Sequence, residues 1–233
     1  MMERIAIVAD IHANIHALQV FMDHINKECE VSKILNVGDF LQIGPNPVEV
    51  FDIVMNDKRF INIMGNNEHV LFNRKLMEFP KDEVEHQDWV INQLGKERMD
   101  KLEKLPFKRI INIKNKKILM LHSRINSIIE FPLLYEKKSL EEFIDDYDED
   151  VDYVLIGHTH LPLYATNWSL KNILNPGAFG CGKDGIVKFI IMDIDNELVN
   201  ITYKQLKYDK QKVVDDFKRN NVPYGEKFCK IFY

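Results

Sequence analysis

The stretch RIAIVADIHANIHALQVFMDHINKE, Arg4 to Glu28, decides the fold class of this protein. It opens with a short β-rich run, Arg4 to Ala9, and continues with apolar side chains at the three- and four-residue spacing of an amphipathic helix. A strand followed directly by a helix is the unit from which α/β proteins with parallel sheets are built. If the unit repeats along the chain, such a sheet is expected.

The same strand-then-helix order recurs twice. The run KILNV precedes the helical PVEVFDIVMND, and the run FINIM precedes the helical NEHVLFNRKLMEF. We therefore expect the first half of the chain to form a parallel sheet with helices on its faces.

The second half of the chain has a different pattern of predicted elements. A helical pattern runs from about Asp82 to Leu105 and gives way to closely spaced strands. These are RIINIKNKKILMLH, which reads as a hairpin around Asn115 and Lys116, and then DYVLIG, LYATN, NILN and IVKFIIMDI. No linker rich in Pro, Gly or Ser separates the halves. We expect a single α/β domain over residues 1–233, with two sheets packed on each other.

The composition is that of a soluble globular protein, with 45% hydrophobic and 29% charged residues. The amino terminus has no signal-peptide pattern and no run of about 18 apolar residues occurs, so we expect a cytoplasmic protein that does not bind membranes. The net charge of -5 disfavours a nucleic-acid partner. Nothing in the sequence indicates the oligomeric state.

The three cysteines, Cys29, Cys181 and Cys229, are scattered and form no CxxC pair. This spacing signals neither a disulfide framework nor a thiolate zinc site. We expect buried or inert thiols.

Side chains of the kind that bind metals collect where the predicted strands end. The set consists of Asp10, His12, Asp39, Asn66, His122, His158 and His160. The carboxyl ends of the strands in an open α/β sheet meet at one edge, so residues distant in sequence can converge there. Side chains two apart in an extended segment point the same way, which lets Asp-x-His and His-x-His pairs each bind from one side.

The size of this set indicates more than one ion. A lone histidine such as His122 is more often a structural residue, but seven ligand-type residues at five strand ends make coincidence a poor explanation. Two aspartates, one asparagine and four histidines suit two ions that share a carboxylate. Mixed nitrogen and oxygen ligands without thiolate point to manganese, iron, zinc, nickel or cobalt, and away from calcium or magnesium. Such a centre is suited to phosphoester hydrolysis by a metal-activated water.

The same residues resemble the motifs of the calcineurin-like metallophosphoesterases. The matching blocks are DIH at 10–12, GD at 38–39, GNNE at 65–68, His122 and GHTH at 157–160. The stretches GDFLQIGPNPVEV and NPGAFG are further similar to the compact bacterial and archaeal phosphodiesterase branch of that family. The resemblance implies a four-layer α/β/β/α sandwich, with two mixed β-sheets flanked by helices, and a metal-dependent phosphoesterase.

The resemblance also implies how two ions would be shared. One ion would be held by Asp10, His12, Asp39 and His160, and the other by Asp39, Asn66, His122 and His158. Asp39 would then bridge them.

One position departs from the family. In much of the family a histidine follows the metal-binding asparagine and protonates the leaving group or steadies the phosphate, whereas here the residue is Asn67. An amide can donate a hydrogen bond but supplies no proton at neutral pH. Asn67 remains a catalytic candidate, and the leaving-group proton is expected to come from elsewhere. His69, two residues further along the chain, is a candidate proton donor. The simpler interpretation is that His69 lies on the following helix and takes no part in catalysis.

Two residues are candidates for binding substrate. Arg124 can bind a phosphate oxygen, although a solvated loop arginine is the alternative. Asn14 can contact substrate or cap the helix that follows it, and capping is the favoured interpretation. The helical segment at about 66–107 is expected to cover the site.

We therefore expect a phosphodiesterase or phosphomonoesterase acting on a small molecule or a nucleotide. Diadenosine polyphosphate hydrolysis and protein phosphatase activity are alternatives within the enzyme class. The alternative outside it is a protein-interaction scaffold, as in the retromer subunit that resembles this family. The four ligand-type histidines favour the enzyme, whereas Asn67 in place of the family histidine leaves the scaffold alternative possible.

Overall fold

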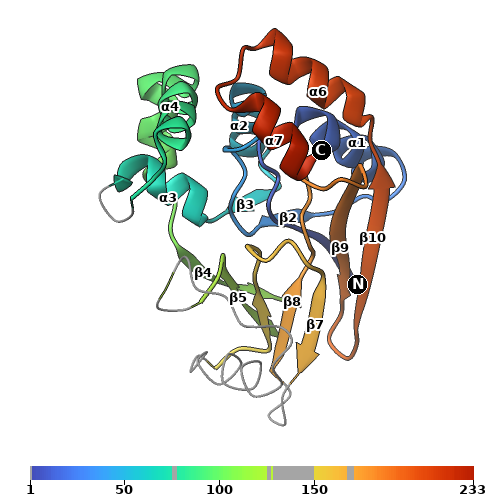
Figure 1. Ribbon diagram of the computed structural model, residues 1–233. Coiled ribbons are helices and arrows are strands. Elements are labelled where there is room, and N and C mark those ends of the chain that lie inside the picture. The colour runs from blue at the N-terminus through green and yellow to red at the C-terminus, as the bar shows by residue number, and fades with distance from the viewer. Residues whose placement is uncertain (1, 75–77, 125–126, 128–149, 167–170) are drawn as a thin grey trace.

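The computed structural model describes residues 2–74, 78–124, 127, 150–166 and 171–233 (Figure 1). Its strands form two five-stranded sheets, with the orders β10-β9-β1-β2-β3 and β4-β5-β6-β8-β7. The first sheet consists of β1 (Glu3–Val8), β2 (Lys33–Asn36), β3 (Phe60–Asn62), β9 (Ile186–Ile194) and β10 (Val199–Lys207). The second consists of β4 (Lys108–Ile113), β5 (Lys116–Leu121), β6 (Tyr153–Leu155), β7 (Leu163–Thr166) and β8 (Asn172–Asn175).

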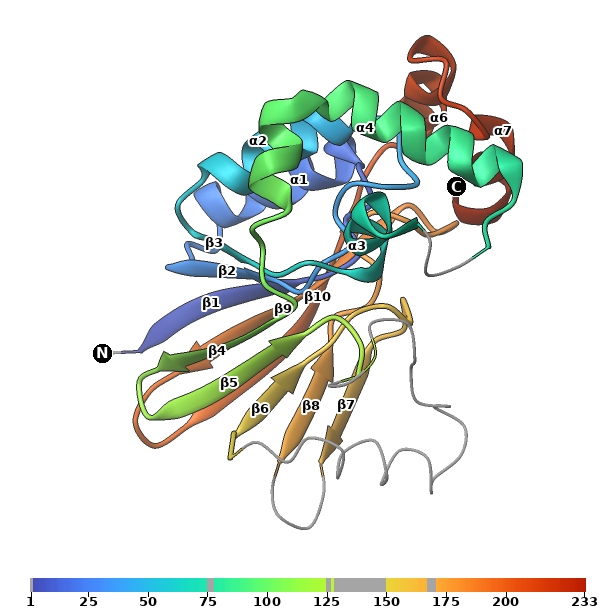
Figure 2. The ribbon, with the colours of Figure 1, turned by 90° about the vertical axis from the view of Figure 1, so that its left-hand side faces the viewer.

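The described helices lie on the side of the first sheet that faces away from the second (Figure 2). They are α1 (Ile15–Lys27), α2 (Pro47–Asn56), α3 (Asn66–Phe72), α4 (Lys81–Leu102), α6 (Lys210–Arg219) and α7 (Gly225–Phe232). The predicted sandwich of two mixed sheets flanked by helices is confirmed. A helical layer over the outer face of the second sheet, which the resemblance implies, lies outside the described residues.

Strand β1 shows why both faces of the first sheet are buried. Ala6 and Val8 pack among the helices, whereas Ile5 and Ile7 pack against the second sheet, and all four are fully buried. Side chains alternate between the two faces of a strand, so a continuous apolar run is what a strand between two packed layers requires. Strand β1 therefore belongs to both cores, and Asp10 follows it directly.

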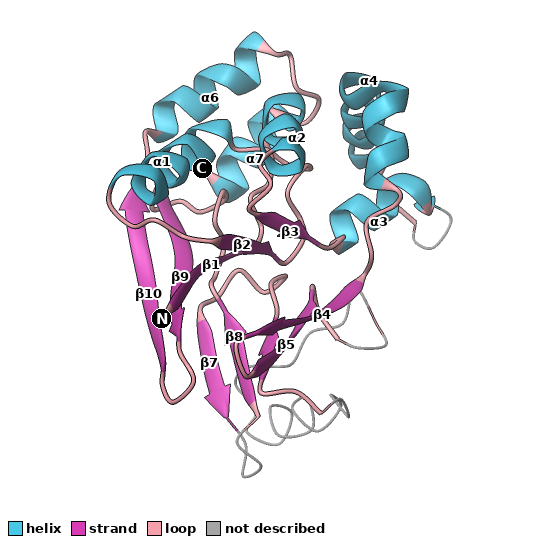
Figure 3. Ribbon diagram, turned by 180° about the vertical axis from the view of Figure 1, so that it is seen from behind, coloured by secondary structure: helices cyan, strands magenta, loops and turns pink. Residues whose placement is uncertain are grey.

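The strand-helix order correctly predicts parallel pairing of β1 with β2 and of β2 with β3. The first sheet is mixed, as in the predicted sandwich, because β9 pairs antiparallel with β1 (Figure 3). Strand β9 comes from the strand-rich second half yet joins the first sheet, where its Phe189 and Ile190 face opposite cores. A strand pattern does not specify the pairing partner, which is why this placement was missed. Strand β10 and helices α6 and α7 were not predicted either.

Three predicted boundaries shift. Helix α3 begins at Asn66, one residue before the predicted start at Asn67. Helix α4 ends at Leu102, and Gly95 interrupts it with a φ of 65°. The turn of the β4–β5 hairpin is at residues 114–115, and Lys116 is already the first residue of β5.

Asn14 caps helix α1, as the favoured interpretation predicts. Its Oδ1 accepts a hydrogen bond from the Ala17 N–H at 3.0 Å. Its Nδ2 donates to the Gly180 carbonyl at 2.7 Å, and the side chain is fully buried. Asn14 therefore also joins the loop after β1 to the loop after β8.

His86 on α4 should make the fold sensitive to acid. The side chain is 1% exposed, and its Nε2 accepts a hydrogen bond from the Ile43 N–H at 3.1 Å, which requires the neutral ring. Burial lowers the pKa of His86 from its usual 6.5 to about 4. The unfolded chain therefore binds this proton at a higher pH than the folded chain. The stability contribution is complete above pH 6.5 and falls by about 3 kcal/mol as the pH drops toward 4.

We expect His86→Gln, which keeps an acceptor for Ile43, to lose less stability than wild type between pH 7 and pH 4.5. The free energy of unfolding in urea at the two pH values measures this difference. His24→Gln on α1 is the matched control. Equal losses in wild type and His86→Gln would contradict the expectation.

Candidate metal centre

The segments that follow five strands bring the predicted ligands to one place. They carry Asp10 and His12 after β1, Asp39 after β2, Asn66 after β3, His122 after β5, and His158 and His160 after β6. Backbone hydrogen bonds join the loops to one another. The Asp10 N–H donates to the Gly38 carbonyl at 3.1 Å, and the Gly157 N–H donates to the His122 carbonyl at 2.9 Å. Both sheets thus contribute strand ends to a shared site. The sequence pattern alone did not indicate which of the two sheets each strand belongs to.

The backbone of the site is strained. Asp10, His12, Asp39, His158 and His160 have positive φ angles of 59°, 48°, 56°, 66° and 59°. A backbone with positive φ costs a residue other than glycine about 1–3 kcal/mol. Such a conformation is kept only where contacts with the surrounding structure hold it in place. Strain shared by these residues indicates a functional constraint on where their side chains point.

One group of donor atoms surrounds Asn66. Its Oδ1 lies 2.8 Å from His158 Nδ1 and 3.0 Å from His122 Nε2. The same atom lies 3.2 Å from Asp39 Oδ2, which is itself 3.1 Å from His122 Nε2. His122 Nδ1 donates to the Val37 carbonyl at 2.7 Å, so its Nε2 presents a lone pair to the group. Lone pairs that converge in this way suit a cation.

A second group lies beside the first. His12 Nε2 and His160 Nε2 are 3.0 Å apart. Asp10 Oδ1 lies 3.5 Å from His160 Nε2 and 3.9 Å from His12 Nε2. Ligand atoms of Asp10, His12 and Asp39 lie within 4.8 Å of one another, so Asp39 borders both groups.

Unpartnered buried atoms support a metal at this position. Asp10 Oδ2 and His12 Nδ1 have no hydrogen-bond partner among the described residues, and both side chains are fully buried. Such atoms are uncommon in native proteins and need an explanation. Carboxylate and imidazole donors fit a divalent transition-metal ion, which would compensate the buried negative charge.

The electrostatics of the site favour positive charge. Burial lowers the pKa of His122, but the Asp39 carboxylate outweighs it and raises that pKa to about 9. Burial likewise opposes protonation of His160, whereas Asp10 raises the pKa of this ring to about 11. Protons and metal ions therefore compete for the same nitrogens, and metal binding should release protons.

Asn67 lies against Asp39. Its N–H donates to Asp39 Oδ1 at 2.9 Å, and its Nδ2 donates to Asp39 Oδ2 at 2.5 Å. These two hydrogen bonds orient the carboxylate between the two groups of donors. A catalytic role of Asn67 toward substrate remains a prediction.

Glu68 is a residue of the site that the sequence analysis missed. Its buried carboxylate accepts from the N–H groups of Asp39 and Gly65 at 2.8 and 3.0 Å. It also accepts from Phe40 and Leu41 at 2.9 and 3.0 Å. Burial and the Asp39 charge raise the pKa of Glu68 to about 7, and the Gly65 and Leu41 N–H groups oppose that rise. A glutamate at the third position of a helix is a capping-box signal that could have identified it.

The remaining predicted residues are Arg124, Asn14 and His69. Arg124 follows β5, and its N–H donates to the Ser127 carbonyl at 3.0 Å. Asn14 has both ends of its amide engaged by backbone, as described above. His69 lies on α3, where its ring packs edge-on against Phe107 at 4.8 Å between ring centres. The substrate-binding roles of Asn14 and Arg124 remain predictions.

Cys181 is buried, as expected, but its neighbours were not anticipated. Its Sγ lies 3.4 Å from His160 Nδ1. Burial raises the pKa of the thiol, but His12 and His160 outweigh burial and lower that pKa to about 7. Ligand atoms of Cys181, His12 and His160 lie within 4.8 Å of one another, which does not fit an inert thiol.

The centre is partly exposed at Asn66, His158 and His160. The side chain of His160 is 28% exposed, whereas that of His122 is 1% exposed. Phe232 of α7 lies near this opening, with its ring centre 6.4 Å from that of His160.

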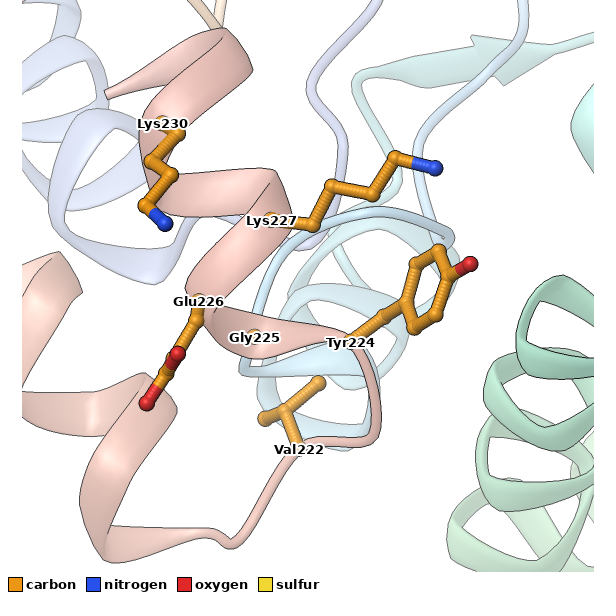
Figure 4. A pocket seen from close by; sticks show the side chains of 6 residues that line it. All are labelled: Val222, Tyr224, Gly225, Glu226, Lys227 and Lys230. Atoms are coloured by element: carbon orange, nitrogen blue, oxygen red, sulfur yellow. The ribbon is translucent and has the colours of Figure 1, made fainter.

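A separate cavity of about 470 Å³ lies beside α7 (Figure 4). It is lined by Val222, Tyr224, Gly225, Glu226, Lys227 and Lys230. None of these residues belongs to the predicted ligands, so this cavity is distinct from the metal centre. In the described part of the chain, no helix combines the length and the apolar character needed to cross a membrane.

The chain matches the calcineurin-like phosphoesterase superfamily domain over residues 2–197. An uncharacterized protein of Methanocaldococcus jannaschii is 26% identical over 234 residues, covering 94% of this chain and 93% of that protein. A metallophosphoesterase from Sphaerobacter thermophilus has a similar fold, with a TM-score of 0.78 and 22% identity over 99% of this chain and 98% of that chain. A hypothetical protein from Pyrococcus horikoshii has a TM-score of 0.81 and 19% identity, covering 99% of this chain and 97% of that chain.

Proposed function

The chain belongs to the calcineurin-like phosphoesterase superfamily, and from this premise we propose that it hydrolyses phosphoesters with two divalent metal ions. The observation that carries the proposal is the convergence of lone pairs from both sheets around Asp39. The substrate class that we propose is a small or nucleotide phosphodiester or phosphomonoester.

The residues that would hold the ions form two groups that share Asp39. The first group is Asp10, His12, Asp39 and His160, and the second is Asp39, Asn66, His122 and His158. When bound, two divalent ions acidify water and neutralise the charge of the transferring phosphoryl group. Manganese, iron, zinc, nickel and cobalt all suit these donors.

The protein supports this chemistry by holding its ligands rigid. The Val37 carbonyl fixes the orientation of His122, and Asn67 fixes Asp39. Glu68 joins the loops that carry Asp39 and Asn66 through backbone hydrogen bonds. Ligands held in this way lose little freedom when an ion or a phosphate binds.

Substrate would enter from the side of His160. Phe232 lies at this opening, and we propose that Arg124 contacts a phosphate oxygen beyond it. We further propose that the segment 66–107 bounds the site, since α3 supplies Asn66 and α4 packs against α2 and α3. Because Asn67 already donates to Asp39, the leaving-group proton is assigned to solvent rather than to this side chain.

An assay with bis-p-nitrophenyl phosphate and added manganese or nickel tests the proposal. We expect metal-dependent hydrolysis that His158→Ala lowers by about 10²-fold or more, the range seen when a preorganised transition-state contact is removed. His24→Ala on α1, outside the site, is the matched control and should retain wild-type activity.

Two results would contradict the proposal. One is wild-type protein that is inactive with every metal, which would favour the scaffold alternative. The other is activity that His158→Ala leaves unchanged. A parallel assay with p-nitrophenyl phosphate shows whether the protein hydrolyses a phosphomonoester faster or slower than the phosphodiester.

A further inference from the structure

Cys181 lies at the edge of the group formed by Asp10, His12 and His160. The residue is 5% exposed, and its Sγ is 3.4 Å from Nδ1 and 4.0 Å from Nε2 of His160. The two distances differ by only 0.6 Å. A sulfur that accepts a straight hydrogen bond from Nδ1 would be much farther from Nε2, because the two nitrogens lie on different sides of the ring. The position of the sulfur is therefore not that of a simple partner of Nδ1.

Bond lengths show what binding to one ion would require. Zn–S and Zn–N bonds of about 2.3 and 2.1 Å at a tetrahedral angle place sulfur and nitrogen about 3.6 Å apart. The observed separation of Sγ from His160 Nε2 is 4.0 Å, and ligand atoms of Cys181, His12 and His160 lie within 4.8 Å of one another. Because an ion on Nε2 would hold its sulfur ligand about 5 Å from Nδ1, the His160 ring must also turn relative to the sulfur when both bind one ion.

The backbone holds Cys181 in this position. The N–H groups of Phe179 and Gly180 donate to the carbonyls of Ala9 and Asp10 at 3.0 and 2.9 Å. A Cβ added at Gly180 would lie 1.7 Å from the Ile11 carbonyl oxygen, so the loop touches the backbone of the loop after β1. The next residue along the chain, Cys181, is thereby directed at the metal centre.

Unpartnered atoms of neighbouring donors provide further support. His12 Nδ1 and Asp10 Oδ2 are buried and have no hydrogen-bond partner in the described ranges. Cys181 therefore lies in an incomplete group of buried donors. The other thiols differ, since Cys29 and Cys229 are only partly buried and neither is grouped with a histidine in the described part of the chain.

We propose that Cys181 is a further ligand of the ion held by Asp10, His12, Asp39 and His160, and that its thiolate makes this position prefer zinc, iron or cobalt to manganese. The inference rests on the proposed metal centre. The sulfur–metal bond forms as the thiol proton passes to solvent. Thiolate is a soft ligand that selects thiophilic ions, whereas oxygen donors suit manganese and magnesium.

Cobalt spectroscopy tests the proposal without an activity assay. We expect the wild-type protein loaded with Co²⁺ to show a sulfur-to-cobalt charge-transfer absorption in the near ultraviolet. Cys181→Ser should lose this band, and Cys229→Ser should keep it as the matched control. Zinc affinity relative to manganese should fall by about tenfold or more in Cys181→Ser, the lower end of the effect of removing a metal-site partner.

The outcomes separate this inference from the proposed function. Cobalt bound in stoichiometric amount without a sulfur band in wild type overturns the role of Cys181 and leaves the metal centre intact. Absence of bound cobalt overturns both. The wild-type spectrum decides the matter even if Cys181→Ser fails to fold, because it needs no variant.

Discussion

Replacing Asp39 by asparagine is expected to lower phosphoesterase activity by more than about 10³-fold, beyond the loss seen when a single preorganised hydrogen-bond donor is removed. Asp39 borders both groups of donors, through His122 on one side and through Asp10 and His12 on the other. An amide keeps the shape of the side chain but removes its negative charge. Both ions would lose a ligand at once.

Metal analysis measures this effect separately from activity. We expect Asp39→Asn to retain fewer than two tightly bound ions per chain after gel filtration. Asp52→Asn is the matched control, because Asp52 is 43% exposed and pairs with Arg98 on the surface. Retention of two tightly bound ions by Asp39→Asn would overturn the assignment of Asp39 as the shared ligand.

Replacing Glu68 by alanine is expected to cost about 4 kcal/mol of stability. Four backbone N–H groups donate to the Glu68 carboxylate, and a buried donor left without a partner costs about 1 kcal/mol or more. Two of these donors belong to Asp39 and Gly65, so the loop that carries Asp39 and the start of α3 at Asn66 would also separate. Metal affinity should therefore fall together with stability.

Urea unfolding of metal-free protein measures the loss of stability, and zinc titration measures the loss of affinity. Glu85→Ala on α4 is the matched control, since Glu85 is exposed and its only described ion pair is with Lys81. A change in stability within about 0.5 kcal/mol, the usual range for a surface substitution, would contradict the role of Glu68.

The local pattern predicted which candidate ligands would come together, because their positions follow from secondary structure. Asp10 and His12 follow a buried strand, and a strand end in an α/β sheet is where ligands gather. The histidines of GHTH were predicted on the same grounds. The blocks DIH, GD, GNNE and GHTH then indicated the family that the superfamily match confirms.

Residues without such a local signal were missed or misjudged. Cys181 carries no motif, and its proximity to His160 arises only because the loop after β8 returns to β1. Strand β9 reads as a strand but gives no indication that it pairs with β1. The sequence placed Asn67 where relatives often have a catalytic histidine, but it did not indicate that the backbone N–H and Nδ2 of this residue donate to Asp39.

The sequence by itself determined which segments are strands and helices in most of the chain, which residues can bind metal, and which family those residues indicate. Periodicity and residue chemistry are local properties, so they can be read without knowing the fold. Tertiary structure alone decided which donor atoms lie close to one another, because that depends on how the ends of two separate sheets meet. It also decided that Glu68 and Cys181 border the centre, since burial and backbone contacts between distant loops place them there and leave no pattern along the chain.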